Sequence, residues 1–319
     1  MKIMKTLSLL ILLAINILTV KGSMPCDTAT VETDITLRTA TGDISGTITI
    51  PGRSSKMPVA LIIAGSGPTD RDGNNPVMKN NSLKILAHEL AKNGIASLRY
   101  DKRGVAASKA AVKSEADLRF DDYVSDAYGW LQILKNDDRF SEIIVIGHSE
   151  GSLIGMLAGT SADKFISIAG FGQSADLILK EQLGAQPKMV QDLSFPIIDS
   201  LKNGNSVKNV PPMLNSLFRQ SVQPYMISWF RYDPQVEISK LSVPILIIQG
   251  TNDIQVGVEN ARQLSDANPD AELLLINNMN HIFRITGGDR MANIATYSDI
   301  NMPVSEELVN SVTGFILGD

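Results

Sequence analysis

A serine lies between two glycines at the point where a run of aliphatic residues ends. Residues 143–146 read Ile-Ile-Val-Ile, and Gly147-His148-Ser149-Glu150-Gly151 follows directly. A sharp turn from a buried strand into a helix would expose the Ser149 hydroxyl, and the glycines would let the backbone pass close to it. Such a hydroxyl can attack an acyl carbon. A five-residue pattern also occurs by chance, so the prediction depends on the groups that could activate the serine.

A serine hydroxyl is a poor nucleophile near neutral pH unless a base removes its proton. The chain has three histidines. We expect His88 to lie on the polar face of a helix, and the turn at Ser149 to point the adjacent His148 elsewhere. His281, in a loop after the last predicted strand, is therefore the candidate base.

The imidazole of such a base needs a carboxylate, which fixes its tautomer and stabilises its charged form. Asp253 directly follows a predicted strand at residues 244–249, and ligands of open α/β sheets bind at such strand ends. Asp253 is therefore the candidate carboxylate. Asp266 and Asp270 remain alternatives, although both lie beside a predicted helix end.

An acyl-transfer site also needs hydrogen-bond donors for the oxyanion. The first would be the backbone N–H of Glu150, which directly follows the serine. The second would come from the Gly-Ser-Gly-Pro turn at residues 65–68, where we favour the N–H of Ser66 over that of Gly67.

Charged side chains flank both donors, and each allows two interpretations. Asp70, Arg71 and Asp72 are typical of a solvated charged run; alternatively, Asp70 and Arg71 pair and fix the oxyanion loop. The Glu150 side chain is typical of an exposed acid in a first helical turn, where the helix dipole favours negative charge. Alternatively, it perturbs His281 or binds a cationic group.

Apolar runs and helical patterns alternate along the chain. They predict the strands and helices that must position the candidate catalytic residues. A hairpin is predicted over residues 30–50 with its turn at 41–43, then strands at 58–64, 96–100, 143–146, 165–169, 244–249 and 272–276. Helices are predicted over 83–91, over 120–134 with Ser114 as a candidate N-cap, and over 304–317. This alternation predicts a mostly parallel sheet with helices on both faces.

One stretch, about residues 172–235, breaks the alternation because helical fragments separated by prolines replace the strands. We expect a helical cap packed over the strand ends, with an ordinary run of surface helices as the alternative. In a cap, apolar side chains would line an acyl pocket. The candidate substrate-binding residues are Phe218, Tyr225, Met226 and Trp229.

The first 22 residues are typical of a secretory signal peptide, because two lysines precede a short apolar run from Leu7 to Val20. We expect cleavage after Gly22, a secreted or periplasmic protein of residues 23–319, and no stable membrane anchor afterwards. The alternative is an uncleaved anchor or a hydrophobic first helix. Cys26 is the single cysteine, so it forms no internal disulfide.

Composition excludes several classes of protein. Apolar residues make up 44% of the 319 residues, which is enough for a large core. The net charge of −5 and the lack of a basic stripe argue against a nucleic-acid partner. One Cys and three scattered His suggest no metal site, and no glycine-rich loop matches a phosphate or dinucleotide signature, so we expect no cofactor.

Six ordered stretches of the chain together resemble the α/β-hydrolase superfamily over about residues 35–319. They are Ala64 to Asn74, Tyr100-Asp101-Lys102-Arg103-Gly104, Gly147 to Gly151, Tyr232-Asp233-Pro234, Gly250 to Asp253 and Asn280-His281. The chain is most similar to bacterial secreted esterases related to serine aminopeptidase-like hydrolases. The resemblance implies an eight-stranded sheet, a helical cap, the chain order Ser149, Asp253, His281 and cofactor-free ester hydrolysis.

Two positions depart from the family pattern. Ala64 replaces the histidine that usually precedes the oxyanion glycine, and Ala106 stands where glycine is commoner. We expect Ala64 to affect the packing of the loop more than its chemistry. Arg103 is expected to anchor a loop, with a role in substrate binding as the alternative.

Three functions follow from these residues. The first is a secreted serine hydrolase that cleaves small-molecule carboxylic esters through an acyl-enzyme on Ser149. The second is an aminopeptidase-like peptidase or amidase of the same fold, which would need an acidic group such as Glu150 for the substrate amine. The third is a non-catalytic secreted binding protein, which would have no need of an intact triad.

Overall fold

The computed structural model describes residues 30–52 and 55–318. The predicted signal peptide, residues 1–22, and Cys26 lie outside the described residues. Within them, eight strands form one sheet in the order β1-β2-β4-β3-β5-β6-β7-β8, and the pairs beyond β4 are all parallel. The strands are β1 (Val31–Thr39), β2 (Gly42–Ile50), β3 (Met57–Ile63), β4 (Ala96–Tyr100), β5 (Phe140–His148), β6 (Lys164–Ile168), β7 (Ile245–Gly250) and β8 (Glu272–Ile276).

This sheet confirms the predicted α/β-hydrolase fold class. The predicted strands at 96–100 and 272–276 coincide with β4 and β8. The central strands β4 and β7 are buried along their whole length, as expected for parallel strands covered on both faces.

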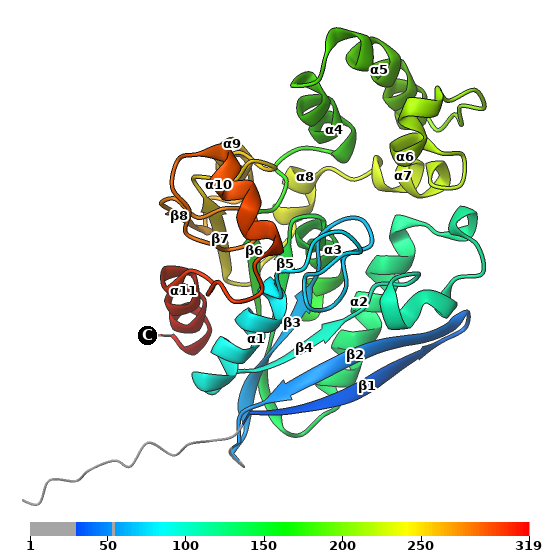
Figure 1. Ribbon diagram of the computed structural model, residues 1–319. Helices are drawn as coiled ribbons and strands as arrows, with labels where there is room; N and C mark the ends of the chain where they lie inside the picture. The colour runs from blue at the N-terminus through cyan, green and yellow to red at the C-terminus, as the bar shows by residue number, and fades with distance from the viewer. Residues whose placement is uncertain (1–29, 53–54, 319) are drawn as a thin grey trace, which may run out of the picture.

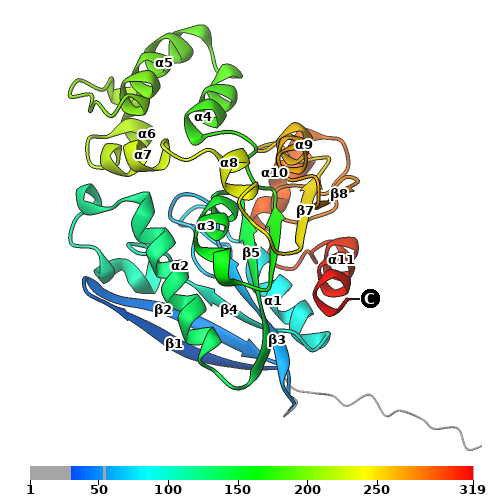
Figure 2. The same ribbon diagram turned by 180° about the vertical axis from the view of Figure 1, so that it is seen from behind.

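Helices cover both faces of the sheet (Figures 1 and 2). The α-helices are α1 (Ser82–Lys92), α2 (Phe120–Lys135), α3 (Glu150–Ala158), α4 (Ala175–Gly184), α5 (Lys188–Lys202), α6 (Asn215–Phe218), α7 (Gln223–Trp229), α8 (Pro234–Ile238), α9 (Val258–Ala267), α10 (Arg290–Ala295) and α11 (Glu306–Leu317). Short 3₁₀ segments are η1 (Ala106–Ala111), η2 (Glu115–Asp117), η3 (Gly159–Ser161), η4 (Pro212–Leu214) and η5 (Thr296–Ser298).

Alternate side chains of the central strands supply two separate hydrophobic cores. In β3, Val59, Leu61 and Ile63 join the core that contains residues of α2 and α3. Ala60 and Ile62 point to the opposite face, into the core that contains residues of α1 and α11. The period of two along the strand therefore fixes the strand register, because a shift by one residue would exchange the two faces.

The N-cap of one helix and the start of another differ from the sequence predictions. Ser114 accepts a hydrogen bond from Ala116 N and caps η2, whereas α2 begins later, at Phe120. The last helix begins at Glu306 rather than at 304, because the Ser305 side chain accepts from the N–H of Leu308. In both places, a serine side chain that accepts a hydrogen bond from a free N–H caps the helical segment that directly follows it.

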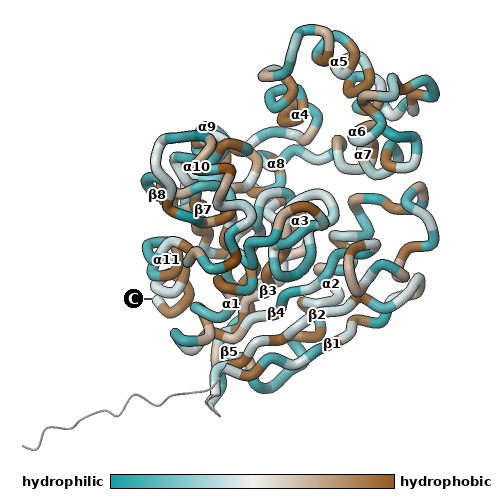
Figure 3. Tube along the Cα trace, in the orientation of Figure 1, coloured by the Kyte–Doolittle hydropathy of each residue, from teal (hydrophilic) through white to brown (hydrophobic). Residues whose placement is uncertain are grey.

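Helices α4 to α7 lie between β6 and β7 in the chain and sit over the carboxyl ends of the strands (Figures 1 and 2). The hydrophobic and hydrophilic residues of α5 interleave along the chain (Figure 3). Its buried residues Ser194, Ile197, Ile198 and Leu201 recur every three or four positions and form one face. Among the described residues, no helix combines the length and apolar character that a membrane span requires.

Trp130 on α2 offers a test of the core. Its side chain is fully buried and lies 5.9 Å from the ring of Tyr100, centroid to centroid. We expect Trp130→Ala to lower the free energy of unfolding by about 3–5 kcal/mol, because a large cavity replaces the ring. Urea denaturation followed by circular dichroism measures the loss.

The matched control is Trp130→Phe, which keeps an aromatic ring. It also removes an indole N–H that has no hydrogen-bond partner within the described part of the chain. We expect a markedly smaller loss for this variant. Equal losses for the two variants would contradict the assignment of Trp130 as a packing residue.

Candidate active site

Ser149 occupies a strained turn between β5 and α3, as the sequence predicts. Its backbone angles are φ 56° and ψ −122°, a combination that costs a non-glycine residue about 1–3 kcal/mol. The flanking glycines allow this turn. A Cβ atom on Gly147 would lie 2.4 Å from the Gly151 oxygen, and one on Gly151 would lie 2.2 Å from the Ile63 oxygen. Neither position could accept a larger residue without displacing backbone.

His281 and Asp253 form a buried pair. His281 Nδ1 lies 2.7 Å from Asp253 Oδ2, and the two side chains are 6% and 1% exposed. The backbone N–H groups of Gln255 and Val256 donate to the other carboxylate oxygen, and Gln249 Nε2 donates to Oδ2 at 3.1 Å. Asp266 and Asp270, the alternatives, are exposed.

These contacts keep the Asp253 carboxylate ionised. Burial alone would raise its pKa, but the charge and hydrogen bond of His281, together with the two backbone N–H groups, hold the pKa below its usual value. An ionised carboxylate accepts a hydrogen bond from Nδ1–H, which stays protonated, so Nε2 is the nitrogen of His281 that can exchange a proton with another group.

The other two histidines have different surroundings. Burial, and then the neighbouring His281 ring, lower the pKa of His148 to about 3, so its imidazole is neutral near pH 7. His148 Nε2 lies 2.9 Å from the His281 carbonyl oxygen and donates to it, which helps to hold the loop of the candidate base. His88 lies far from Ser149 in the chain and pairs with Glu32 at 2.9 Å.

Asn280 gives the loop its shape. Its side-chain oxygen accepts the N–H groups of Ile282 and Arg284, and its amide donates to Asn293 and Thr296. The loop that carries His281 is therefore fixed on both sides of the histidine.

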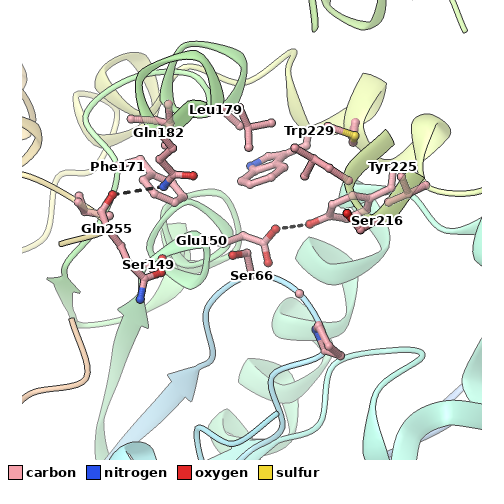
Figure 4. Close-up of a pocket in the computed structure, with 18 of the residues that line it drawn as sticks. Ser66, Ser149, Glu150, Phe171, Leu179, Gln182, Ser216, Tyr225, Trp229 and Gln255 are labelled. Atoms are coloured by element: carbon pink, nitrogen blue, oxygen red, sulfur yellow. Dashed lines mark hydrogen bonds between the residues drawn. The ribbon is translucent and has the colours of Figure 1, made fainter. Parts of the chain in front are cut away.

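Two cavities meet at Ser149. The larger, about 330 Å³, lies under the cap (Figure 4). Of the predicted substrate-binding residues, Tyr225, Met226 and Trp229 line it. The smaller cavity, about 120 Å³, shares Ser66, Ser149 and Gln255 with the larger one and is bordered by His281 as well.

Phe218 corrects the prediction, because it does not line either of these two cavities. It is fully buried in the core, while the preceding residue, Leu217, faces the larger cavity. Consecutive residues of a helix point about 100° apart, and α6 turns Phe218 inward.

Both predicted oxyanion donors border the larger cavity beside Ser149 (Figure 4). A Cβ atom on Gly65 would lie 3.1 Å from Ser149 Cβ, so the loop that carries Ser66 lies directly against the serine. Within the described residues, neither the Ser66 N–H nor the Glu150 N–H has a protein acceptor. The two N–H groups are thus available to an oxygen bound in the cavity.

The Glu150 side chain is buried rather than exposed, which overturns the prediction of a solvated first-turn acid. Its Oε2 lies 2.9 Å from Lys102 Nζ, and both side chains are 1% exposed. The hydroxyl of Tyr225 donates to Oε1. Burial and the Glu150 carboxylate raise the pKa of Tyr225 well above its usual value, so this hydroxyl stays protonated. Lys102 Nζ also donates to the Gly65 carbonyl oxygen.

Sequence reasoning missed Lys102, although its position offered a signal. It follows the fully buried strand β4 at the carboxyl edge of the sheet, where a cation needs an anionic partner. Gln249 was also missed, and a glutamine inside an otherwise aliphatic strand gives no comparable signal.

The charged run at residues 70–72 is half-buried and matches neither interpretation. Arg71 pairs with Asp101 at 2.8 Å, and Asp72 pairs with Arg99 at 2.6 Å. Asp70 instead accepts the N–H groups of Asp72 and Asn74. These contacts fold the segment into a turn that continues from the Ser66 loop.

The residues after Asp101 have structural contacts. Arg103 forms a buried ion pair with Asp126 and donates to the Ala111 carbonyl, consistent with the predicted loop anchor. Ala106 adopts φ 43°, in the left-handed region that explains why glycine is commoner there.

The buried pair of Lys102 and Glu150 predicts a large and specific loss of stability. Lys102→Met would leave the carboxylate buried without its cation, and we expect the free energy of unfolding to fall by about 3–5 kcal/mol. The double variant Lys102→Met/Glu150→Gln removes both charges and should recover most of that loss. Urea denaturation of the single and double variants measures the coupling.

The exposed pair of Lys188 and Asp192 on α5 is the control, with side chains 79% and 58% exposed. Lys188→Met should change the free energy of unfolding by less than about 0.5 kcal/mol. Additive effects at Lys102 and Glu150 would contradict a coupled pair.

A family model and a curated protein match the chain. Residues 80–236 match the family model described as serine aminopeptidase, S33. The chain is 27% identical over 269 residues to esterase EstD of Thermotoga maritima. That match covers 79% of this chain and 60% of EstD.

Solved structures extend the likeness over most of the chain. Est1E from Butyrivibrio proteoclasticus, solved with ferulic acid bound, has a TM-score of 0.60 and 16% identity, covering 89% of this chain and all of Est1E. The Pyrococcus furiosus esterase Pf2001 has a TM-score of 0.55 and 15% identity, covering 92% of this chain and 95% of Pf2001. At these identities, the likeness establishes the fold. Sheet order and the likeness to these structures show that the chain has the α/β-hydrolase fold, and residues 80–236 are similar to the serine aminopeptidase, S33, family.

Proposed function

We propose that the protein is a serine hydrolase that cleaves carboxylic esters. The observation that carries the proposal is the convergence of Ser149, on its strained turn, with the buried pair of His281 and Asp253 at one small cavity. The similarity to esterase EstD supports an ester as the substrate.

The proposed reaction has two steps. In the first, Ser149 Oγ bonds to the acyl carbon while its proton passes to His281 Nε2; the bond to the alcohol oxygen then breaks, and His281 returns the proton to that oxygen. In the second, His281 deprotonates a water that attacks the acyl-enzyme. The proton returns to Ser149, and the carboxylic acid leaves.

The surrounding residues have supporting roles in this scheme. Asp253 holds the imidazole with Nδ1 protonated and stabilises the imidazolium that forms. The N–H groups of Ser66 and Glu150 would donate to the oxyanion, a contribution that typically amounts to about 10²–10³ in rate for one donor.

The charges around the two cavities favour an ester as the substrate over a peptide with a free amino terminus. An aminopeptidase would need a free carboxylate for the substrate ammonium group. Among the residues that line the two cavities, the carboxylate that faces the substrate space is that of Glu150, and Lys102 and Tyr225 already bind it. A non-catalytic binding protein is disfavoured because nothing in ligand binding requires a strained serine beside a paired histidine.

The proposed location, secreted or periplasmic, rests on the sequence of residues 1–22. Its test is the N-terminal sequence of the protein recovered from the producing cells, which should begin after Gly22.

Ser149→Ala tests the nucleophile. We expect hydrolysis of p-nitrophenyl acetate and butyrate to fall by at least about 10³-fold, since the acyl-enzyme no longer forms. A fluorophosphonate probe should label the unsubstituted protein at Ser149 and fail to label the variant. Retention of most activity by Ser149→Ala would refute the assignment, and aminoacyl amides assayed in parallel test the peptidase alternative.

Asp253→Asn tests the carboxylate. An amide at this position favours the wrong imidazole tautomer, so we expect kcat to fall on the order of 10⁴-fold. Asp266→Asn and Asp270→Asn are matched controls in exposed positions and should keep kcat within about twofold. A loss confined to one of these two would transfer the role to that residue.

A further inference from the structure

The two cavities that meet at Ser149 differ in chemistry. The larger is walled mainly by apolar side chains from the cap and the core, with Phe171, Leu179, Met226 and Trp229 among them. Its carboxylate, Glu150, is neutralised by Lys102. An apolar group would enter this space without leaving a charge unpaired.

The smaller cavity is polar, and several of its groups have unused hydrogen-bonding capacity. The Tyr297 hydroxyl accepts from Gln255 Nε2 at 3.2 Å, which leaves its own proton to donate. Within the described residues, Ser82 Oγ has no hydrogen-bond partner, and Asn75 uses only its side-chain oxygen. Ser82 and Tyr297 are 1% and 5% exposed. Each of these groups can therefore form a further hydrogen bond with a polar occupant of the cavity.

The proposed mechanism assigns one part of the substrate to each cavity. The alcohol oxygen must lie near His281, because His281 returns the proton to it when the ester bond breaks. His281 borders the smaller cavity and Glu150 borders the larger one, while Ser66, the other candidate donor to the oxyanion of the acyl group, borders both. The alcohol therefore extends into the smaller, polar cavity, and the acyl chain extends under the cap.

We propose that the substrate is an ester of an apolar acid with a small polyol, bound with the acyl group under the cap and the hydroxylated alcohol between Ser82, Asn75 and Tyr297. This inference rests on the proposed function. A cavity of about 120 Å³ has the volume of roughly four water-sized groups, which fits a glycerol-sized alcohol better than an extended chain.

The first experiment compares hexanoate esters that differ only in the alcohol. We expect kcat/KM for 1-hexanoylglycerol to exceed that for propyl hexanoate by about 10-fold, the effect of one to two hydrogen bonds. A third ester, 6-O-hexanoyl glucose, distinguishes a glycerol-sized alcohol from a sugar. A higher kcat/KM for the glyceryl or the glucosyl ester than for the propyl ester supports a polyol as the alcohol. The order of the glyceryl and glucosyl values then gives the size of that polyol.

The second experiment uses variants of the two cavities. Tyr297→Phe and Ser82→Ala should each lower the ratio of glyceryl to propyl kcat/KM by about 3–10-fold, because each removes one hydroxyl from the alcohol side. The matched variant on the acyl side is Leu179→Ala. It should shift the preferred acyl chain length and leave the glyceryl-to-propyl ratio within about twofold.

Equal kcat/KM for the glyceryl, glucosyl and propyl esters would mean that the small cavity holds only water, and would overturn the inference. A higher kcat/KM for the propyl ester than for the glyceryl and glucosyl esters would show that the alcohol side prefers an apolar group and would also overturn it. In both cases, the proposed function would still hold if hydrolysis of p-nitrophenyl esters is lost in Ser149→Ala. Loss of that dependence would refute the proposed function itself.

Discussion

The close backbone packing around Ser149 is the constraint on which the site depends. Glycines 147 and 151 let β5 and α3 approach within distances that a single methyl group would prevent, and Gly151 lies against β3. The same contacts bring the Ser66 loop, which follows β3, to the serine. The strained conformation of Ser149 is maintained because the surrounding sheet and helix are buried and allow no relaxation.

A buried ion pair between Lys102 and Glu150 lies next to this packed backbone. Lys102 binds both the Glu150 carboxylate and the carbonyl of Gly65, so one ammonium group connects the residue after the serine to the residue before Ser66. Such a pair contributes little net stability compared with an apolar core. Its value here is positional, since one predicted oxyanion donor belongs to Glu150 itself and the other to Ser66, which follows Gly65.

The sequence was sufficient for the features that depend on local pattern. Strand positions, the Ser149 turn and the proximity of Asp253 to His281 follow from apolar periodicity and from side chains at strand ends.

Features that depend on side-chain partners could not be predicted from the sequence. Glu150 could be placed in a first helical turn, but its burial depends on Lys102, 48 residues earlier. Phe218 was assigned by residue type, whereas the orientation of the short helix α6 decides which of two neighbours faces the cavity. For Arg71, the sequence suggests either solvation or a pair with its neighbour Asp70, but the fold pairs it with Asp101.

The cap, helices α4 to α7, is anchored unevenly to the rest of the fold. On the α7 side, the Ser228 hydroxyl accepts from the Phe120 N–H, Tyr225 reaches Glu150, and aromatic rings stack between α7 and α2. On the α4 side, the side chain of Gln182 meets the exposed Gln255 carbonyl at 3.2 Å (Figure 4). A single surface amide separates far more readily than a buried aromatic cluster. Opening the cap on the α4 side would therefore break fewer buried contacts than opening it on the α7 side.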